Sequence, residues 1–393
     1  MKILMLSFYY PPDIGPGPLR AHSIVEAIKN NPGNEVYIDI LTTMPNRYST
    51  LPAEALAREQ GSVVSIHRIE LPIHKSGMGD QAVAFISYAR TVIKEIRGQE
   101  WDLVVATSSR LMTAALGAYI AVSRGSLLYL DIRDLFSDTM DSILRKRSLR
   151  ILLPLIRVLE QWTFKSADRI NVVSEGFLPY VKEIVPTLSP SVFTNGIDDE
   201  FLAYDFIKSD SDDLPTVVYA GNIGEGQGLD LIIPDVARAN LGRALFRVIG
   251  DGGKRKELLK RLDEQGLSNV QVQDPVPRAE LLAYYRDADI LFLHLNAYSA
   301  FEKVLPSKIF EYGATGKPIL AGVSGYAGDY LRANVPGVEV FEPCDHVGMQ
   351  LGLQRLLAGP RMIDRRDFKV NNNRMMIAAK MANDILSLVE KAD

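Results

Sequence analysis

Short apolar runs rich in β-branched residues alternate with longer amphipathic patterns along the whole chain of 393 residues. Runs of this kind are typical of buried parallel strands, and their alternation with helices is typical of a sheet covered by helices on both faces. Two such series are present. They are separated by residues 198–215, which are rich in Asp and Ser and show no regular periodicity. The sequence therefore predicts an α/β protein of two doubly wound, Rossmann-like domains that face a cleft.

The pattern also predicts where the elements of each domain lie. Ala21, Ile24, Val25 and Ile28 recur at helical spacing and predict an amphipathic helix at 18–30. We predict a first domain at 1–197, a linker at 198–215, a second domain at 216–373, and a last helix within 374–393 that returns to the first domain. The expected strands are 2–7, 35–41, 63–68, 103–107, 127–131, 169–173 and 191–193 in the first domain, and 216–220, 245–250, 270–272, 289–295, 318–321 and 338–341 in the second.

Composition narrows the class of protein. Cys344 is the only cysteine, which excludes an internal disulfide and a cysteine-based zinc site and favours a reducing, cytoplasmic location. The formal net charge of −4 gives no electrostatic reason to expect a nucleic-acid partner. No apolar run approaches the roughly 20 residues that span a bilayer.

One basic stretch allows two interpretations. Within 145–162, five cations are interleaved with apolar residues and Trp162: Arg145, Lys146, Arg147, Arg150 and Arg157. Such a segment suits the anionic inner face of a cell membrane, which would make the protein peripheral. A solvated helix with a buried apolar face explains the same pattern. Both readings stay open at this point.

Three glycine-rich loops follow predicted strands, where ligands bind in doubly wound folds. Gly15 and Gly17 precede a helix, so they allow close backbone approach to an anion at its N-terminus, although a plain strand-to-helix turn explains them too. The loop at 219–228 holds four glycines, beginning at Gly221, and is expected to contact phosphate. Gly250 opens a third loop, which is at least as typical of an ordinary turn.

The segment from Lys303 to Tyr312 is the most informative. Pro306 suits the first position of a helix, and Gly316 suits its end about three turns later. Lys308 would then lie in the first turn, where the helix dipole disfavours a cation unless an anion is bound nearby. We predict that Lys303, Pro306, Ser307 and Lys308 surround a diphosphate and that Glu311 accepts hydrogen bonds from a ribose. A simple surface pair of Lys308 with Glu311 is the alternative.

Seven short segments carry a resemblance to a known family: 11–17, 171–177, 194–198, 219–222, 249–252, 285–290 and 306–312. In this order along the chain, they resemble glycosyltransferase family 4, the retaining enzymes of the GT-B fold. The branch of the family that this sequence resembles builds O-antigen and capsular repeat units, and it includes the N-acetyl-fucosamine transferases. The resemblance implies a UDP-sugar donor, possible N-acetylated 6-deoxyhexose transfer to a polyprenyl-diphosphate-linked saccharide, and surface polysaccharide biosynthesis.

This sequence departs from the family pattern at the donor site. The family motif has two glutamates eight positions apart; Glu311 matches the second, but Lys303 stands at the first. The family usually has an Arg and a Lys in the loop after the second domain's first strand, where this chain has Asn222 and Gln227. We predict that Lys303 and Lys308 supply the charge that the loop lacks. Gly221, Asn222, Gln227 and Gly250 remain predicted donor contacts.

The resemblance also implies residues near the reacting sugar. Arg133 stands where the family often has a His, with Asp134 beside it and Asp131 at the strand end. Together with Lys303 they are the predicted catalytic residues, although buried Asp/Arg pairs are also common structural networks. The family implies no essential cofactor or metal, and positioning plus charge stabilisation of the leaving diphosphate would drive catalysis.

Two other functions fit the same observations. A nucleotide-sugar 2-epimerase shares the fold and would convert UDP-GlcNAc without an acceptor. A non-catalytic nucleotide-sugar-binding protein would explain the missing Glu and the missing cations.

Overall fold

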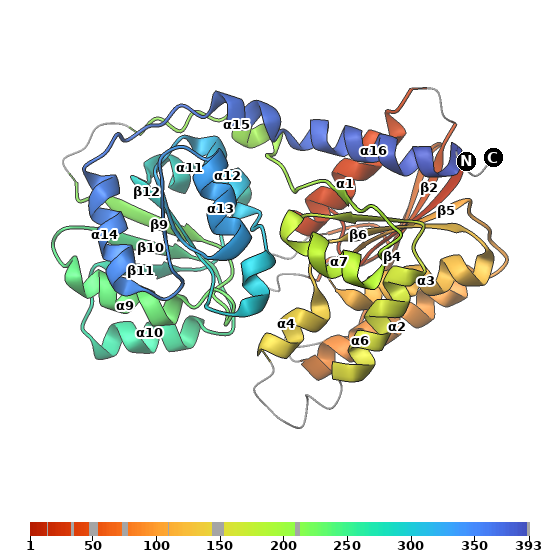
Figure 1. Cartoon of the computed structure of the whole chain (residues 1–393), viewed down its shortest axis with the longest axis horizontal. Helices are drawn as coiled ribbons and strands as arrows, with labels where there is room; N and C mark the ends of the chain where they lie inside the picture. Colours follow the sequence, from red (N-terminus) through yellow and green to blue (C-terminus); the bar gives the residue numbers. More distant parts are fainter. Residues whose placement is uncertain are drawn as a thin grey trace. The chain divides into compact units, whose positions relative to one another are not determined.

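The computed structural model describes residues 1–13, 15–32, 35–46, 54–72, 78–108, 110–143, 153–208 and 213–390 (Figure 1). The chain forms two compact units. The first is Met1–Asn195 together with Arg374–Asp393, and the second is Gly196–Asn373. Each unit is a sheet of parallel strands, with one antiparallel edge strand in the first unit, and is flanked by helices, which confirms the predicted α/β class.

The first unit is built on an eight-stranded sheet in the order β3-β4-β2-β1-β5-β6-β7-β8. All pairings are parallel except that of β3 with β4. The central strand β1 has residues Ile3–Leu6 fully buried, as expected for a strand covered on both faces. The strands are β1 (Lys2–Ser7), β2 (Tyr37–Thr43), β3 (Arg58–Gln60), β4 (Val64–Ile69), β5 (Leu103–Ser108), β6 (Leu127–Ile132), β7 (Arg169–Val172) and β8 (Ser191–Val192).

Helix α1 shows how the amphipathic pattern becomes packing. Ala21, Ile24, Val25 and Ile28 are all buried, as their spacing predicted. They pack in one core with the C-terminal helix α16, which belongs to the first unit. The helices of this unit are α1 (Pro16–Lys29), α2 (Met78–Glu95), α3 (Leu111–Arg124), α4 (Phe136–Ile143), α6 (Leu153–Lys165), α7 (Leu178–Ile184) and α16 (Arg374–Glu390), with a 3₁₀ turn η1 (Glu175–Phe177).

The second unit is built on a six-stranded parallel sheet in the order β11-β10-β9-β12-β13-β14. Its strands are β9 (Thr216–Ala220), β10 (Leu245–Ile249), β11 (Val270–Gln273), β12 (Ile290–His294), β13 (Ile319–Gly322) and β14 (Val338–Phe341). Its helices are α8 (Asp199–Ala203), α9 (Leu229–Ala239), α10 (Arg255–Glu264), α11 (Arg278–Asp287), α12 (Lys308–Thr315), α13 (Gly325–Asn334), α14 (His346–Leu357) and α15 (Arg366–Asn371), with a 3₁₀ segment η2 (Ser299–Lys303).

The structure differs from the sequence-based prediction at two segments. Residues 198–215 were predicted to be a linker, but the described part of this range belongs to the second unit. Phe201 and Phe206 are buried in that unit's core, so α8 is held by packing that the acidic composition did not reveal. The edge strand β3 was also missed, because its three residues are all exposed and polar.

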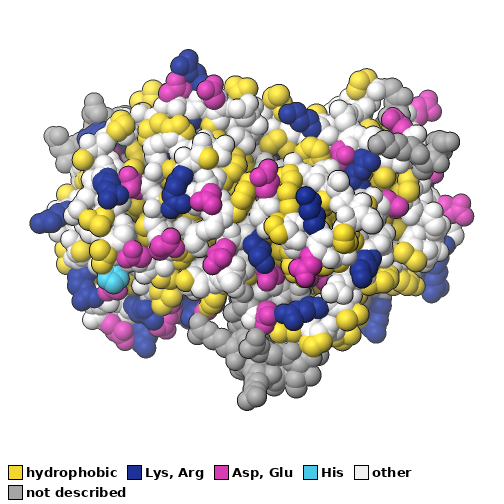
Figure 2. All heavy atoms as spheres, in the orientation of Figure 1, with side chains coloured by type: hydrophobic (Ala, Val, Ile, Leu, Met, Phe, Trp, Pro, Cys, Tyr) yellow, Lys and Arg dark blue, Asp and Glu magenta, His cyan; other side chains and the backbone are white. Residues whose placement is uncertain are grey.

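Basic and acidic side chains intermingle over the face of the molecule in Figure 2.

Helices of the described ranges are all too short or too polar to cross a bilayer.

Candidate functional site

The chain reverses direction across the second sheet between β9 and β12. The series β9, β10, β11 builds one half of the sheet, and β12, β13, β14 builds the other, starting again beside β9. Ligands of doubly wound folds bind at such a switch point, outside the carboxyl ends of the strands. The glycine loop that follows β9 lies at this position, as does the segment that follows β12.

These two segments are joined by hydrogen bonds. The backbone N–H of Asn296 donates to the carbonyl of Gly226 at 2.8 Å, and its side-chain amide donates to the carbonyl of Glu225 at 2.9 Å. The Tyr298 hydroxyl donates to the Glu225 carboxylate at 2.8 Å. The loop is therefore held in one conformation by the β12 side of the switch point, which is the preorganisation that a binding loop requires.

Lys308 lies directly against the first glycine of this loop. A Cβ atom built on Gly221 would be 2.2 Å from the Lys308 Nζ, and Gly221 has a φ of 144°. The same Nζ lies 5.4 Å from the centre of the Tyr219 ring. Gly221 in turn is covered by Gly250, whose own Cβ would collide with the Gly221 carbonyl. The structure thus brings together three of the predicted residues: Gly221, Gly250 and Lys308.

Asn222 and Gln227 lie on the same loop. The Asn222 side-chain amide donates to the Gln227 Oε1 at 2.7 Å, and the Asn222 carbonyl accepts from the Tyr219 hydroxyl at 2.7 Å. In this conformation the two amides bridge the loop across Gly224, at the positions where the family pattern places cations. Two described cations contact this loop: Lys308 lies against Gly221, and Lys254 pairs with the Glu225 carboxylate at 3.0 Å.

Helix α12 begins at Lys308, two residues later than predicted. Pro306 and Ser307 precede it, and their carbonyls accept from the N–H groups of Ile309 and Phe310 at 3.1 Å each. These three-residue turns tighten the helix entry, so Pro306 lies outside the helix proper. Lys308 is in the first turn as predicted, and the helix ends at Gly316 in the left-handed conformation. Lys303 ends η2, five residues before Lys308.

Glu311 lies one turn into α12 and forms part of a charge cluster that sequence reasoning missed. Its Oε1 is 3.8 Å from an Nη of Arg278, the first residue of α11. Asp198 and Glu200 also pair with Arg278, and its guanidinium lies 4.9 Å from the Phe201 ring centre. Burial opposes the charge of Arg278, but these three carboxylates raise its pKa above the ordinary value. No local pattern links the four residues, because they come from three separate segments.

His294 fixes the other end of the glycine loop. It is fully buried at the end of β12, and the backbone N–H of Cys344 donates to its Nε2 at 2.9 Å. The proton of the neutral ring therefore lies on Nδ1, which donates to the carbonyl of Gln227 at 2.5 Å. Burial lowers the pKa of His294 to about 4, although the bond to Gln227 favours the charged form. His294 is thus a buried structural histidine.

In the first unit the structure brings together Gly17 and Arg133. A Cβ atom at Gly17 would lie 2.6 Å from an Nη of Arg133, so the glycine leaves the space that the guanidinium fills. Gly15 caps α1 with a φ of 138°. These residues adjoin the switch point of the first sheet, between β1 and β5.

Asp131 is surrounded by hydrogen-bond donors. It is fully buried, and it accepts from Arg20 at 2.8 and 2.9 Å, from Thr107 at 2.8 Å and from Asn171 at 2.7 Å. Burial opposes its ionisation, but Arg20 and these donors hold its pKa below the ordinary value. Such a network favours a structural role for Asp131, whereas Asp134, three residues later, is exposed.

Arg110 is a second residue that sequence reasoning missed. It follows β5 at the switch point of the first sheet, and its guanidinium donates to the Tyr9 hydroxyl at 2.8 Å. It also stacks on Phe8, 4.9 Å from the ring centre. A lone Arg after a strand carries no signal of this placement.

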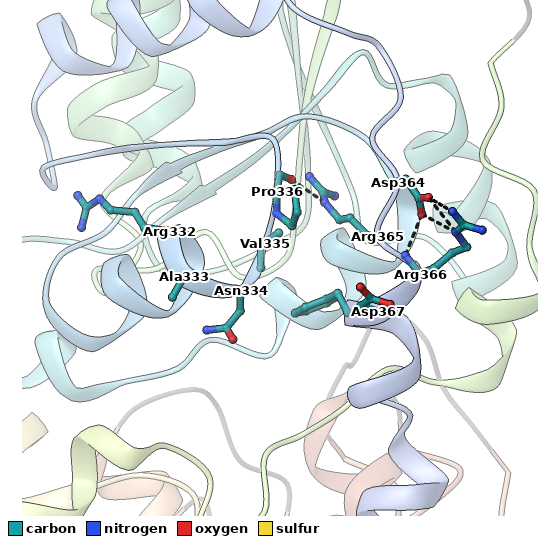
Figure 3. Close-up of a pocket in the computed structure, with 10 residues that line it drawn as sticks. Arg332, Ala333, Asn334, Val335, Pro336, Asp364, Arg365, Arg366 and Asp367 are labelled. Atoms are coloured by element: carbon teal, nitrogen blue, oxygen red, sulfur yellow. Dashed lines mark hydrogen bonds and ion pairs between the residues drawn. The ribbon is translucent and has the colours of Figure 1, made fainter.

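Two further regions do not add to this site. The cations at 145–150 of the predicted membrane segment lie outside the described residues. A cavity of about 580 Å³ lies near Pro336 and Arg365 (Figure 3), at the amino end of β14 and so at the edge opposite the glycine loops. Arg365 there donates to the carbonyls of Pro336, Tyr312 and Gly337, which makes it a packing element.

The second unit is similar in sequence to known glycosyltransferases. Residues 203–375 match the family model "Glycosyl transferases group 1". WcaI of Escherichia coli (strain K12), provisionally named as a colanic acid biosynthesis glycosyl transferase, is 28% identical over 152 residues, which are 38% of this chain and 37% of WcaI. WbjE of Pseudomonas aeruginosa, a probable glycosyltransferase by name, is 24% identical over 250 residues, 61% of this chain and 62% of WbjE. The matched range lies almost wholly within the second unit, and the aligned regions span less than two thirds of either relative.

Solved structures share the fold over the whole chain. Anabaena HepE, solved in complex with UDP-glucose, superposes with a TM-score of 0.64 at 15% identity and covers 100% of this chain and 98% of its own. The lipopolysaccharide outer core galactosyltransferase WaaB gives 0.63 at 12% identity, covering 98% and 99%. A Listeria monocytogenes protein provisionally named as a UDP-N-acetylglucosamine 2-epimerase gives a TM-score of 0.59 at 11% identity, covering 100% of this chain and 97% of its own. The GT-B prediction is confirmed, and the fold is common to transferases and epimerases.

Proposed function

We propose that this chain is a retaining glycosyltransferase that moves a sugar from a UDP-sugar, held by the second unit, to a lipid-linked saccharide. The observation that carries the proposal is the placement of the Lys308 Nζ against Gly221 at the switch point of the second sheet. A cation, a backbone loop that approaches closely because it has no side chain, and the start of a helix are the elements that bind a diphosphate.

Glu311 supports the same assignment. It lies one turn after Lys308, where a carboxylate can accept hydrogen bonds from ribose hydroxyls while Lys308 contacts the phosphates. Arg278, at 3.8 Å, orients this carboxylate. No essential metal is needed in this scheme, because Lys308 and the helix dipole neutralise the leaving diphosphate.

For the acceptor side we propose the first unit, in which Gly17, Arg133 and the exposed Asp134 adjoin the switch point between β1 and β5. We further propose that the acceptor is a polyprenyl-diphosphate-linked saccharide in surface polysaccharide biosynthesis and that the donor sugar is an N-acetylated 6-deoxyhexose. The names of WcaI and WaaB support polysaccharide assembly, and the HepE complex supports a UDP-sugar.

The test is to incubate the protein with UDP-, GDP- and dTDP-sugars, with and without lipid-linked acceptors, and to measure free nucleotide and glycolipid. We expect UDP release that depends on the acceptor. Conversion of UDP-GlcNAc without acceptor would instead establish the epimerase, and binding without turnover of any sugar would establish the non-catalytic alternative.

A further inference from the structure

Helix α6 presents apolar side chains to solvent. Leu155 is 68% exposed and Val158 is 61% exposed, and Trp162 follows one turn later on the same stripe. The only acidic residue of α6, Glu160, points inward and accepts hydrogen bonds from Ser137 and Tyr180. The arrangement is the reverse of an ordinary surface helix, which places its charges outside and its apolar stripe inside.

Helix α3 extends the same surface. It packs against α6 and α2, and Figure 1 shows the three helices side by side in the first unit. Its exposed apolar residues are Met112, Tyr119 and Val122. None of the exposed residues of α3 and α6 is acidic. We call the exposed residues of these two helices the acid-free face.

The charges on the acid-free face are all positive. Arg124 ends α3, and Arg157 and Lys165 lie on α6. Arg157 also pairs with Asp141 of the neighbouring helix α4 at 2.7 Å, which is the one described carboxylate in contact with these cations. Exposed apolar side chains beside cations are typical of a surface that binds a partner with an apolar interior and an anionic outer layer.

We propose that the acid-free face binds the surface of an anionic lipid bilayer. Leu155, Val158 and Tyr119 would enter the region between headgroups and acyl chains, and Trp162 is the residue type that prefers this depth. Lys165 and Arg157 would contact the lipid phosphates. A second copy of the chain fits less well, because a two-fold interface would place this face against itself and bring its cations together. The inference uses neither the donor site nor the identity of the sugar.

The experiment measures co-sedimentation of the full chain with vesicles of phosphatidylglycerol and phosphatidylcholine, and with vesicles of phosphatidylcholine alone. The wild type should bind the anionic vesicles, less strongly as the ionic strength rises. The triple variant Leu155→Ser, Val158→Ser, Trp162→Ser should lower the partition coefficient by about tenfold or more, because three apolar side chains no longer leave water. The pair Arg157→Gln, Lys165→Gln should weaken binding to anionic vesicles only.

The matched control is Val347→Ser with Leu351→Ser on α14, two exposed apolar residues of the second unit. It should bind vesicles as the wild type does. Thermal unfolding of every variant shows whether the fold is intact. The proposal is overturned if the wild type does not bind anionic vesicles, if the triple variant binds unchanged, or if the control loses as much. If the wild type is a dimer and the triple variant is a monomer, a second copy of the chain occupies the face, and this too overturns the proposal. None of these results bears on donor binding, so the proposed function stands or falls separately.

Discussion

The ammonium group of Lys308 fills the space beside Gly221 in which any other residue would carry its side chain, with 2.2 Å between the Nζ and an ideal Cβ at 221. A glycine in the loop after β9 and a lysine at the start of α12 are therefore a single structural unit, although 87 positions separate them in the sequence. The following predictions start from this relationship.

Replacing Lys308 should weaken nucleotide binding. Lys308→Gln removes a charge-assisted contact, worth about 1.5–3 kcal/mol, so we expect the Kd for UDP to rise by about ten- to a hundredfold. Lys303→Gln tests the second lysine that is predicted to supply the charge missing from the glycine loop; Lys303 ends η2, five residues before Lys308. Isothermal titration calorimetry measures both, with Lys260→Gln on α10 as the control, since Lys260 is exposed and pairs only with Glu264 at 3.7 Å in the described contacts. Unchanged UDP affinity in both variants would disprove the prediction that Lys303 and Lys308 replace the cations missing from the glycine loop.

Adding a methyl group at Gly221 should act through Lys308. Gly221→Ala forces a strained backbone at a φ of 144° and displaces the ammonium, so both stability and UDP affinity should fall. Gly242→Ala is the control, because Gly242 also has a positive φ but has open space around its Cβ. It should lose stability, by about 1 kcal/mol, and keep its UDP affinity. In the double variant with Lys308→Gln, the loss of affinity from Gly221→Ala should largely disappear.

Arg278 should be essential for the stability of the second unit. Arg278→Gln leaves Asp198, Glu200 and Glu311 without their shared cation, and we expect a loss of about 2–3 kcal/mol in the free energy of unfolding. Urea denaturation measures it. Arg238→Gln, which removes an exposed pair with Asp235, should change stability by less than about 0.5 kcal/mol. Adding Glu200→Gln should recover part of the loss; a further loss instead would contradict the cluster.

Acidification should destabilise the second unit through His294. Its folded pKa of about 4 lies below the ordinary value of about 6.5, so between these values the unfolded state binds the extra proton. The stabilisation is complete above pH 6.5 and is lost as the pH falls toward 4, by about 3 kcal/mol in all. Urea titrations at several pH values should show this slope, and His294→Asn should flatten it. An equal slope in wild type and variant would assign it to other groups.

The buried pair of Arg20 and Asp131 should be structural. Arg20→Leu leaves a fully buried carboxylate without its hydrogen-bonded cation, and should cost about 3–5 kcal/mol. Asp131→Leu in the same chain should restore a large part of it, because both charges are then gone. Chemical denaturation of the single and double variants decides this. A double variant less stable than Arg20→Leu alone would show that Asp131 has a different role.

Much of this protein follows from local patterns. The alternation of apolar runs and amphipathic helices predicted two parallel α/β units, because burial on both faces of a sheet requires continuous apolar strands. The positions of Gly221, Gly250 and Lys308 followed as well, since loops after parallel strands meet at one edge of the sheet. Gly316 ended α12 as expected, because only glycine adopts the left-handed conformation without strain.

Contacts between distant segments were decided by tertiary structure alone. Phe201 and Phe206 bind a segment of linker-like composition into the core, and Arg278 meets Glu311 although no spacing connects them. Asp131 was predicted to be catalytic from its place beside Arg133 and Asp134 at a strand end. In the fold, however, its carboxylate is surrounded by the donors of Arg20, Thr107 and Asn171. Periodicity records which face of an element is buried, but a charged side chain acquires its partner only when separate elements pack together.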